Sequence, residues 1–190
     1  MTPTRPALAL LAALALSACG APPGVSTVAR LATEDRTASQ ITDDNRILLA
    51  SNKAVAGESA ALFRDVSTDV YVGRVMLTGA VAQAPAKARA VALAKGVEGV
   101  REVVDEIQVT SQGGFSATAN DLVVEQKIGV KLLAESGVKS VNMRWRCVNG
   151  TVYLFGRAHT AAESAKAVEL VRAVENVKRV VNHLRIQPAA

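Results

Sequence analysis

The chain of 190 residues repeats itself at a fixed offset of 77 positions, and this repeat constrains its fold more than any other feature. The repeated residues are mostly glycine and valine. In the first copy they are Gly73, Val75, Leu77, Gly79, Val91, Val97, Glu98, Val100, Val103 and Val104, and in the second Gly150, Val152, Leu154, Gly156, Val168, Val174, Glu175, Val177, Val180 and Val181. Because the offset holds without a gap through strands, turns and a helix, the sequence predicts one small module made twice. Function is then expected where the copies differ.

The N-terminus has the layout of a secretory signal peptide, with Arg5 followed by an apolar run over residues 7–16 that is too short to span a membrane. The run ends in Leu16-Ser17-Ala18-Cys19, which resembles the lipobox of bacterial lipoproteins. That resemblance implies a signal peptide over residues 1–18 and lipidation of Cys19, and an ordinary cleaved signal with an incidental cysteine is the alternative. Several acyl chains would hold the protein stably on a membrane. The next residue is not the Asp that resembles an inner-membrane retention signal, so we expect the outer membrane, on its periplasmic side.

The rest of the chain divides into two modules. Residues 19–40, rich in Pro, Gly, Ser and Thr, are expected to form a flexible linker. The first module covers residues 41–110 and the second module 119–187, with a short linker over 111–118 and a tail over 188–190. Because that linker is short, the modules are expected to touch. Each is near the lower size limit for an independent core, so mutual packing would stabilise both.

Each module is predicted to contain a helix, two strands, a second helix and a third strand, in that order. In the first module, Thr42, Asp43 or Asp44 can cap a helix that runs to about Ala61, and Asn120 or Asp121 can cap its counterpart. Asn149-Gly150 between two alternating runs predicts a hairpin with a type I′ turn. Gly79 and Gly156 follow the hairpins and are expected to permit a bend or a close approach of another segment.

The residues also resemble a known family. The succession Gly150-x-Val152-x-Leu154-x-Gly156, an Ala-rich helix and then Val174-Glu175-x-Val177-x-x-Val180-Val181-Asn182 resembles the BON domain, and the first module shows the same succession. The resemblance implies an α+β fold of two tandem αββαβ modules, each a small three-stranded mixed sheet with two helices on one face. Val72 departs from the pattern, which commonly has Asn before the turn glycine, so the first hairpin is expected to differ in shape.

Two such domains behind a lipobox resemble the DolP-type outer-membrane lipoproteins. This implies a non-enzymatic envelope protein that supports envelope integrity and contacts anionic phospholipid. The charge distribution is independent evidence. Residues 40–110 carry eight Lys and Arg against nine Asp and Glu, a net charge of −1, whereas residues 111–190 carry eleven against six, a net charge of +5. The basic balance therefore belongs to the second module.

Strand alternation locates part of that charge. If Val152 and Leu154 face the helices, the opposite sheet face of the second module is cationic and aromatic. It holds Arg144, Arg146, Val148, Tyr153, Phe155, His183 and Arg185. Such a face suits an anionic membrane surface or a protein partner. Two other interpretations stay open: the face packs on the first module, or it is simply solvated.

The first helix of the second module is the rival surface. There Lys127 and Lys131 flank Ile128 and Leu132, although an i, i+4 apolar pair is expected to face its own sheet. The function predicted from either surface is binding of anionic phospholipid. A scaffold or adaptor for an envelope protein, in outer-membrane assembly or cell division, is the alternative.

The sequence gives little support to the hypothesis that the protein is an enzyme. The chain has two histidines, no Cys/His set with metal spacing and no recognisable nucleophile context, so we expect neither catalysis nor a cofactor or metal. Cys147 is expected to be a small buried side chain, and Trp145 a core residue. The calculated pI near 9.5 would suit nucleic acid, but export argues against that partner.

Overall fold

The computed structural model describes residues 34–111 and 119–188. The predicted signal peptide, the predicted lipidation site Cys19 and most of both predicted linkers lie outside these residues. Thr33–Ala190 forms one compact unit. Within the described ranges, no helix combines the length and the apolar character needed to cross a membrane.

Both modules have the predicted order of elements. The first module contains α2 (Ala38–Glu58), α3 (Ala60–Asp65), β1 (Val66–Tyr71), β2 (Arg74–Val81), α4 (Ala84–Lys95) and β3 (Glu102–Val109). The second contains α5 (Ala119–Ala134), a 3₁₀ turn η1 (Ser140–Asn142), β4 (Met143–Val148), β5 (Thr151–Ala158), α6 (Ala161–Arg172) and β6 (Arg179–Ile186). The middle strand of each sheet pairs antiparallel with the preceding strand and parallel with the last. These two mixed sheets confirm the predicted α+β fold.

The first helix differs from its prediction at both ends. It begins at Ala38 rather than near residue 43, because Thr37 and Gln40 form a capping box: each side chain accepts a hydrogen bond from the backbone N–H of the other residue. It ends at Glu58, where extended Ser59 interrupts the helix and its hydroxyl caps α3. The expected single helix to Ala61 is therefore two helices.

Asp44 and Asp121, predicted as helix caps, instead hold the hairpin turns. The carboxylate of Asp44 accepts hydrogen bonds from the N–H groups of Val72 (2.7 Å) and the glycine after it (2.8 Å). Asp121 does the same for Asn149 (3.1 Å) and Gly150 (3.0 Å). Val72 has a φ of 50° and Asn149 one of 54°. The left-handed turn at Asn149 is confirmed, but the expected difference at Val72 is wrong, because the aspartate holds even a β-branched residue in this conformation.

A glycine in each middle strand permits close contact with the preceding helical segment. Gly79 has a φ of 126° and Gly156 one of 115°. A Cβ atom at Gly79 would lie 2.1 Å from the carbonyl oxygen of Asp65, and one at Gly156 would lie 2.3 Å from that of Asn142. The predicted close approach is confirmed, and it involves the residue just before each first strand.

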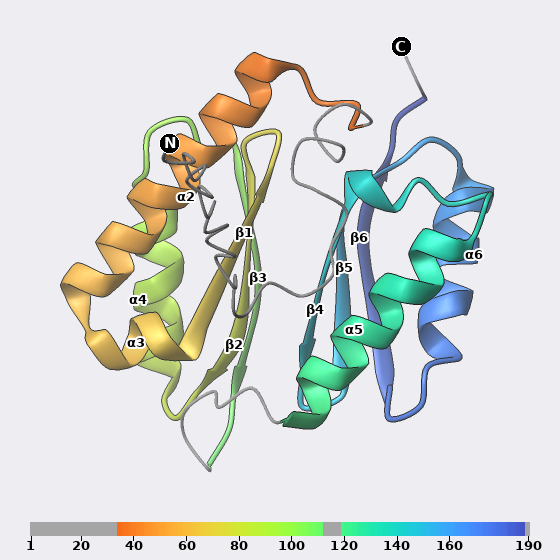
Figure 1. Cartoon of the computed structure of the whole chain (residues 1–190). Helices are drawn as coiled ribbons and strands as arrows, with labels where there is room; N and C mark the ends of the chain where they lie inside the picture. Colours follow the sequence, from red (N-terminus) through yellow and green to blue (C-terminus); the bar gives the residue numbers. More distant parts are fainter. Residues whose placement is uncertain (1–33, 112–118, 189–190) are drawn as a thin grey trace, which may run out of the picture. The chain divides into compact units, whose positions relative to one another are not determined.

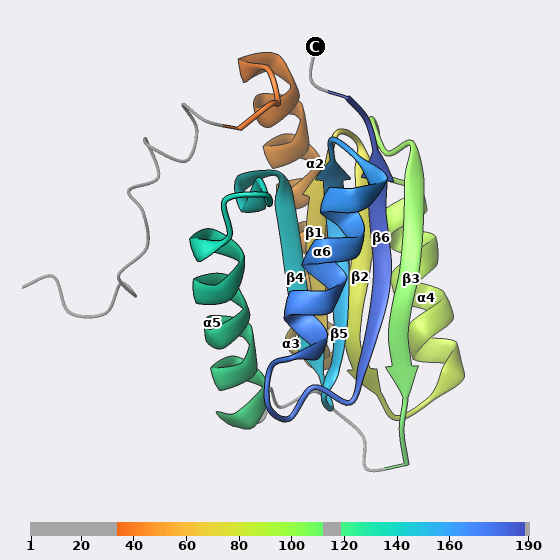
Figure 2. The same ribbon diagram turned by 90° about the vertical axis from the view of Figure 1, so that its right-hand side faces the viewer.

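The helices cover one face of each sheet, and the other two faces meet. Figure 1 shows α2, α3 and α4 on the outer side of β1–β3, with α5 and α6 on the outer side of β4–β6, and Figure 2 shows α5 and α6 in front of their sheet. Each module has its own core between helices and sheet. A third core lies between the sheets and consists of Tyr71, Met76, Ala80, Val148, Tyr153 and Phe155. The expectation that the modules touch is confirmed.

Candidate functional site

The predicted cationic and aromatic face of the second module is the surface that packs on the first. Tyr153 is 1% exposed and Phe155 is fully buried, both in the core between the sheets. A side chain enclosed between two sheets cannot reach a lipid headgroup. Of the interpretations left open, packing on the first module is therefore correct, and Tyr153 and Phe155 are removed as binding candidates. The physical reason is that an apolar sheet face without helices is stabilised by a second sheet.

Arg146 is engaged by the first module. Its guanidinium donates two hydrogen bonds to the carboxylate of Asp69, at 2.7 and 3.1 Å. Burial disfavours the charged form, but the Asp69 carboxylate outweighs it and raises the pKa of Arg146 above its ordinary value. This ion pair crosses between the sheets, so Arg146 is an interface residue and not a free cation.

The pairs across this interface follow the repeat. Asp69 and Arg146 are 77 positions apart, and so are Glu106 and His183, whose carboxylate and ring nitrogen lie 2.7 Å apart. Residues that meet their own counterparts lie near a two-fold axis, as in the interface of a symmetric dimer. The two modules therefore associate like two subunits, with hydrogen-bonding partners at equivalent positions.

Arg185 also reaches the first module. Its guanidinium and that of Arg74 both bind one carboxylate oxygen of Glu102, at 2.5 and 2.8 Å. The hydrogen bond from Arg74 outweighs burial and holds the pKa of Glu102 below its ordinary value. Arg74 lies 4.8 Å above the ring of Phe155, which ties this cluster to the core between the sheets.

Arg144 binds the segment Glu34–Arg36, which we call the N-terminal strap. The Arg144 guanidinium lies 2.9 Å from the carboxylate of Glu34. Arg36 binds Glu34 at 2.9 Å and Asp44 at 2.6 Å, and it stacks 4.9 Å from the centre of the Tyr71 ring. The predicted flexible linker to about residue 40 is therefore wrong for its last residues, because the side chains of Glu34 and Arg36 are buried between contacts with both modules.

The middle residue of the strap, Asp35, binds the second module. Its carboxylate accepts hydrogen bonds from Lys139 (2.8 Å) and Asn142, and it contacts the ring of His159. Burial favours the neutral acid, but these three partners outweigh it and hold the pKa of Asp35 well below its ordinary value. The strap thus joins the modules, since its Arg36 binds the first and its Asp35 the second.

The rival surface, helix α5, remains open to solvent. Ile128 and Leu132 are fully buried, which confirms that this apolar pair faces its own sheet. Lys127 and Lys131 lie beside them on the outside. The ammonium of Lys127 is 3.0 Å from Glu175, and that of Lys131 donates to the carbonyl of Ala173 at 3.1 Å. Both lysines therefore border the turn that follows α6.

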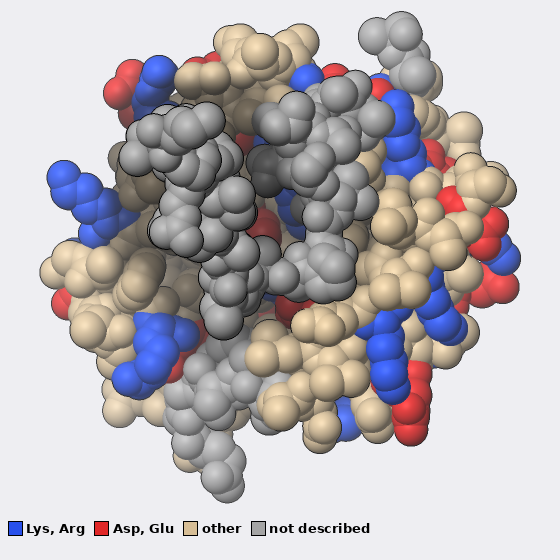
Figure 3. Space-filling view, viewed as in Figure 1, with Lys and Arg blue, Asp and Glu red and all other residues tan. Residues whose placement is uncertain are grey.

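The outer face of α5 is unusually apolar. Val123 is 50% exposed, Val130 70% and Leu133 60%. The positions 77 residues earlier, on α2, hold Arg46, Lys53 and Ala56. In Figure 3, Lys and Arg side chains stand among uncharged atoms over α5. A shallow groove runs between α5 and the turn after α6, with Lys127, Val130 and Lys131 along its α5 side. On the equivalent helix α2, Leu49 is the exposed large aliphatic side chain, beside Arg46, whereas α5 exposes several such side chains beside its lysines.

Two residues singled out by type are structural. Cys147 is buried, and burial together with the neighbouring carboxylate of Asp121 (3.1 Å) raises the pKa of its thiol to about 12. Such a thiol is unreactive. The indole of Trp145 packs against the core of the second module and donates to the carbonyl of Glu125 at 3.0 Å. Across residues 34–111 and 119–188, no group of His, Cys, Asp and Glu is placed to hold a metal ion.

Sequence reasoning missed the strap, Tyr71 and the role of the turn aspartates. Asp44 and Asp121 could have been found, because they too are 77 positions apart. Opposite charges at equivalent positions, such as Asp69 and Arg146, were also a readable signal of mutual packing. No local pattern marked the strap, since its partners are up to 124 residues away along the chain.

Comparison with known proteins agrees with this architecture. The BON domain family matches residues 43–111 and again 120–188. The chain is similar to the outer membrane lipoprotein DolP of Haemophilus influenzae, with 31% identity over 76% of this chain and 75% of that one. It is also similar to the osmotically-inducible protein Y of Escherichia coli, with 29% identity over 75% of this chain and 72% of that one. A structure of the C-terminal domain of CdsD, a type III secretion protein of Chlamydia trachomatis, covers 74% of this chain and 98% of its own, at 13% identity and a TM-score of 0.34.

Proposed function

The chain belongs to the BON domain family, and from that premise we propose that it is a non-enzymatic lipoprotein of the outer membrane, facing the periplasm. In this proposal it supports envelope integrity by binding anionic phospholipid through the outer face of helix α5. The lipobox-like Leu16-Ser17-Ala18-Cys19 and the similarity to an outer membrane lipoprotein support the location. The face of α5 supports the binding.

One observation carries the lipid proposal: exposed aliphatic side chains and lysines share the outer face of α5. Val123, Val130 and Leu133 are at least half exposed, and Lys127 and Lys131 stand beside them. A helix that lies in a membrane interface needs this combination, because its apolar groups enter the acyl boundary while its cations meet the headgroups. Lysines can also extend their ammonium groups along such a surface toward phosphates.

The packing of the sheets engages the three predicted arginines and leaves the lysines of α5 at the surface. Arg144, Arg146 and Arg185 are engaged by the strap and by the first module. Among the described residues, the lysines of α5 bind Glu175 and the carbonyl of Ala173, both in the exposed turn after α6. Each basic residue close to an anionic membrane contributes about 1 kcal/mol, so two lysines give a measurable but modest attraction.

The lipid anchor would make such modest binding sufficient. Fifteen positions separate Cys19 from Glu34. A chain of this length spans at most about 3.6 Å per residue, or roughly 50 Å in total. A tethered module is therefore held at a high effective concentration near the bilayer, where a weak surface contact is enough to orient it.

Vesicle flotation tests this proposal. The fragment 20–190 keeps the whole compact unit and lacks the anchor cysteine, so its binding reports on the protein surface alone. We expect binding to rise with the fraction of phosphatidylglycerol in phosphatidylcholine vesicles and to weaken with salt. Absence of binding to both neutral and anionic vesicles would contradict the proposal.

Charge reversal on α5 locates the binding surface. The double variant Lys127→Glu, Lys131→Glu should weaken binding at least about 30-fold, the equivalent of roughly 2 kcal/mol. The matched control is Arg46→Glu, Lys53→Glu on the outer face of α2, which should change binding little. Equal losses in the two double variants would show that only net charge matters and would remove α5 as the site.

The groove beside α5 favours a second function, that of a scaffold for an envelope protein. An apolar groove with a charged rim also suits a partner helix. A photo-crosslinking residue at position 130 of the full chain in native membranes distinguishes the two. A discrete protein adduct that persists after vesicle binding is abolished would favour the scaffold.

A further inference from the structure

Because the modules are related by a two-fold axis, their interface has two ends in equivalent positions. The residues at these two ends differ, and so do their contacts. At one end, the turn of the second hairpin meets Gln108 of β3. The amide of Gln108 donates to the carbonyl of Val148 and to the hydroxyl of Tyr153, both at 3.1 Å, and accepts from the side chain of Asn149 at 2.9 Å. Its two polar atoms are thus satisfied and this end is closed.

At the other end, the turn of the first hairpin faces Arg185 of β6, the counterpart of Gln108. Arg185 turns to Glu102 instead of closing the turn. A pocket of about 360 Å³ remains, lined from the first module by Tyr71, Arg74, Arg101 and Glu102 and from the second by Arg185. Its volume lies within the range of about 300–1,000 Å³ that is usual for small-molecule sites.

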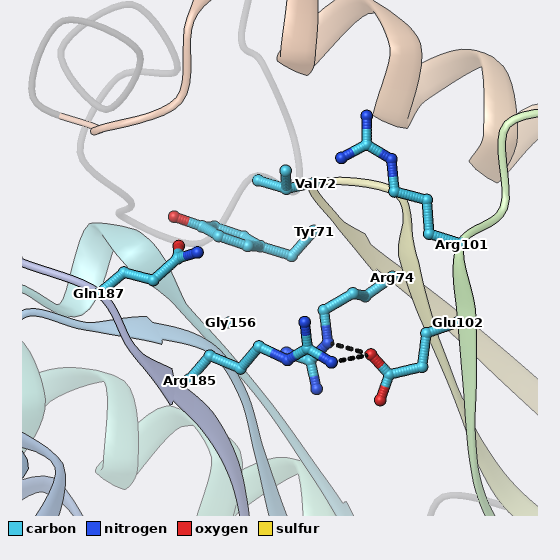
Figure 4. A pocket seen from close by; sticks show the side chains of 8 residues that line it. All are labelled: Tyr71, Val72, Arg74, Arg101, Glu102, Gly156, Arg185 and Gln187. Atoms are coloured by element: carbon cyan, nitrogen blue, oxygen red, sulfur yellow. Dashed lines mark hydrogen bonds and ion pairs between the residues drawn. The ribbon is translucent and has the colours of Figure 1, made fainter.

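The pocket has a surplus of positive charge. Figure 4 shows Arg74 and Arg185 converging on the single carboxylate of Glu102, with Tyr71 beside them and Arg101 at one side. Arg101 is exposed and makes no ion pair with any residue in the described part of the chain. Three arginines thus line the pocket with a single carboxylate, and each guanidinium has five N–H donors, more than Glu102 can accept.

The hydroxyl of Tyr71 is an unused donor at the same place. Tyr71 is 3% exposed, and its hydroxyl has no hydrogen-bond partner among the described residues. Burial, followed by the nearby charge of Glu34, raises the pKa of Tyr71 to about 12, so the group stays protonated and can donate. An unpaired buried hydroxyl is unfavourable. Its counterpart in the second module is Val148, so the fold itself does not require a hydroxyl here.

We propose that this inter-module pocket binds a phosphate group, through Arg101 and Arg185 at its entrance and the hydroxyl of Tyr71 inside. A phosphate offers several acceptor oxygens in different directions, which suits donors that line one pocket from two modules. The group can belong to a free phosphate ester or to a lipid headgroup. None of these residues lies on α5, so the proposal does not rest on the lipid contact proposed above.

Calorimetric titration of the full chain in a non-ionic detergent tests the proposal, with inorganic phosphate and glycerol phosphate as probes. We expect saturable binding that weakens about tenfold in Arg101→Gln and in Arg185→Gln, since each loses a charge-assisted hydrogen bond. The matched control Arg64→Gln removes an exposed arginine of α3 outside the pocket and should change nothing. Tyr71→Phe should weaken binding several-fold without lowering the thermal midpoint, a combination that a purely structural tyrosine would not give.

A second set of titrations identifies the source of the phosphate. If the ligand is a lipid headgroup, nanodiscs that contain phosphatidylglycerol should compete with inorganic phosphate more strongly than nanodiscs made equally anionic with oleate. Equal competition by both kinds of disc would assign the site to a free phosphate ester. The Lys127→Glu, Lys131→Glu variant should bind phosphate normally. No saturable binding of either probe, or an equal loss in Arg64→Gln, would overturn the proposal.

Discussion

The inner sheet faces and the outer helix faces of the two modules both differ between copies, but for different reasons. On the inner faces the differences are complementary: Asp69 meets Arg146, and Glu106 meets His183. On the outer faces the differences are not complementary. Val130 and Leu133 of α5 are exposed, and the equivalent positions on α2 hold Lys53 and Ala56, which do not pair with them. A difference between repeats therefore indicates an external ligand only after pairing between the repeats has been considered.

The same comparison explains the charge asymmetry. The second module carries a net charge of +5 and the first a net charge of −1. Arg146 and Arg185 form ion pairs with carboxylates of the first module, and Arg144 forms an ion pair with the strap. Much of the asymmetry thus stabilises the interface, which is why net charge alone did not locate a binding surface.

The largest expected effect comes from the core between the sheets. Phe155→Ala should lower the free energy of unfolding by about 3–5 kcal/mol, because it leaves a cavity where no side chain can relax freely. Leu133→Ala on the outer face of α5 is the control and should change stability by less than about 0.5 kcal/mol. Urea denaturation measures both. Similar values for the two variants would mean that the sheets do not share a core.

The next effect comes from the pair of Asp69 and Arg146. Arg146→Gln should destabilise the protein by about 2 kcal/mol, between the values for surface and buried pairs, because Asp69 is nearly buried and Arg146 only partly so. A double-mutant cycle with Asp69→Asn should then give a coupling energy of about 1 kcal/mol. Strictly additive effects would show that these counterparts do not interact across the interface.

The smallest effect concerns the strap and depends on pH. The folded-state pKa of Asp35 is lowered, so its contribution to stability is present above the unfolded value of about 3.9 and is lost as pH falls through the folded value. Asp35→Asn should therefore lower the free energy of unfolding by about 1 kcal/mol at pH 7, a value typical of charge-assisted hydrogen bonds. The difference in free energy of unfolding between the variant and the unchanged protein should narrow below about pH 4. Urea denaturation at pH 7 and at pH 3 measures this difference.

The control for the strap is Asp43→Asn, an exposed carboxylate on α2 whose pair with Arg46 is long, at 3.5 Å. This substitution should leave stability almost unchanged at either pH. A stability gap for Asp35→Asn that stays constant from pH 7 to pH 3 would show that the carboxylate of Asp35 does not bind Lys139 and His159 in solution.

Local features of the fold were predictable where a short pattern controls the backbone. The Asn149-Gly150 turn and the close approach at Gly156 follow from residues that accept positive φ. The shape of the first hairpin was not predictable from a short pattern, because Asp44, which lies 28 positions earlier, holds Val72 in its turn. The start of α2 was missed because Thr37 lies in a segment whose composition resembled a linker.

The candidate site was predictable only in part for a similar reason. Alternation correctly placed Arg146, Tyr153 and Phe155 on one face of the sheet, and the helical period correctly buried Ile128 and Leu132. Neither pattern says what covers a face. Lys127 and Lys131 remain candidates because α5 has no further layer outside it in the described part of the chain.

The sequence by itself determined that this protein is one αββαβ module made twice, because turn residues, glycines and apolar periods act over a few positions and recur at a fixed offset. The tertiary structure decided which surfaces remain free. It packed the two uncovered sheet faces together, closed one end of the interface with Gln108 and left a cationic pocket at the other. Those outcomes depend on contacts between residues 40 or more positions apart, and burial of apolar surface acts without regard to such separation.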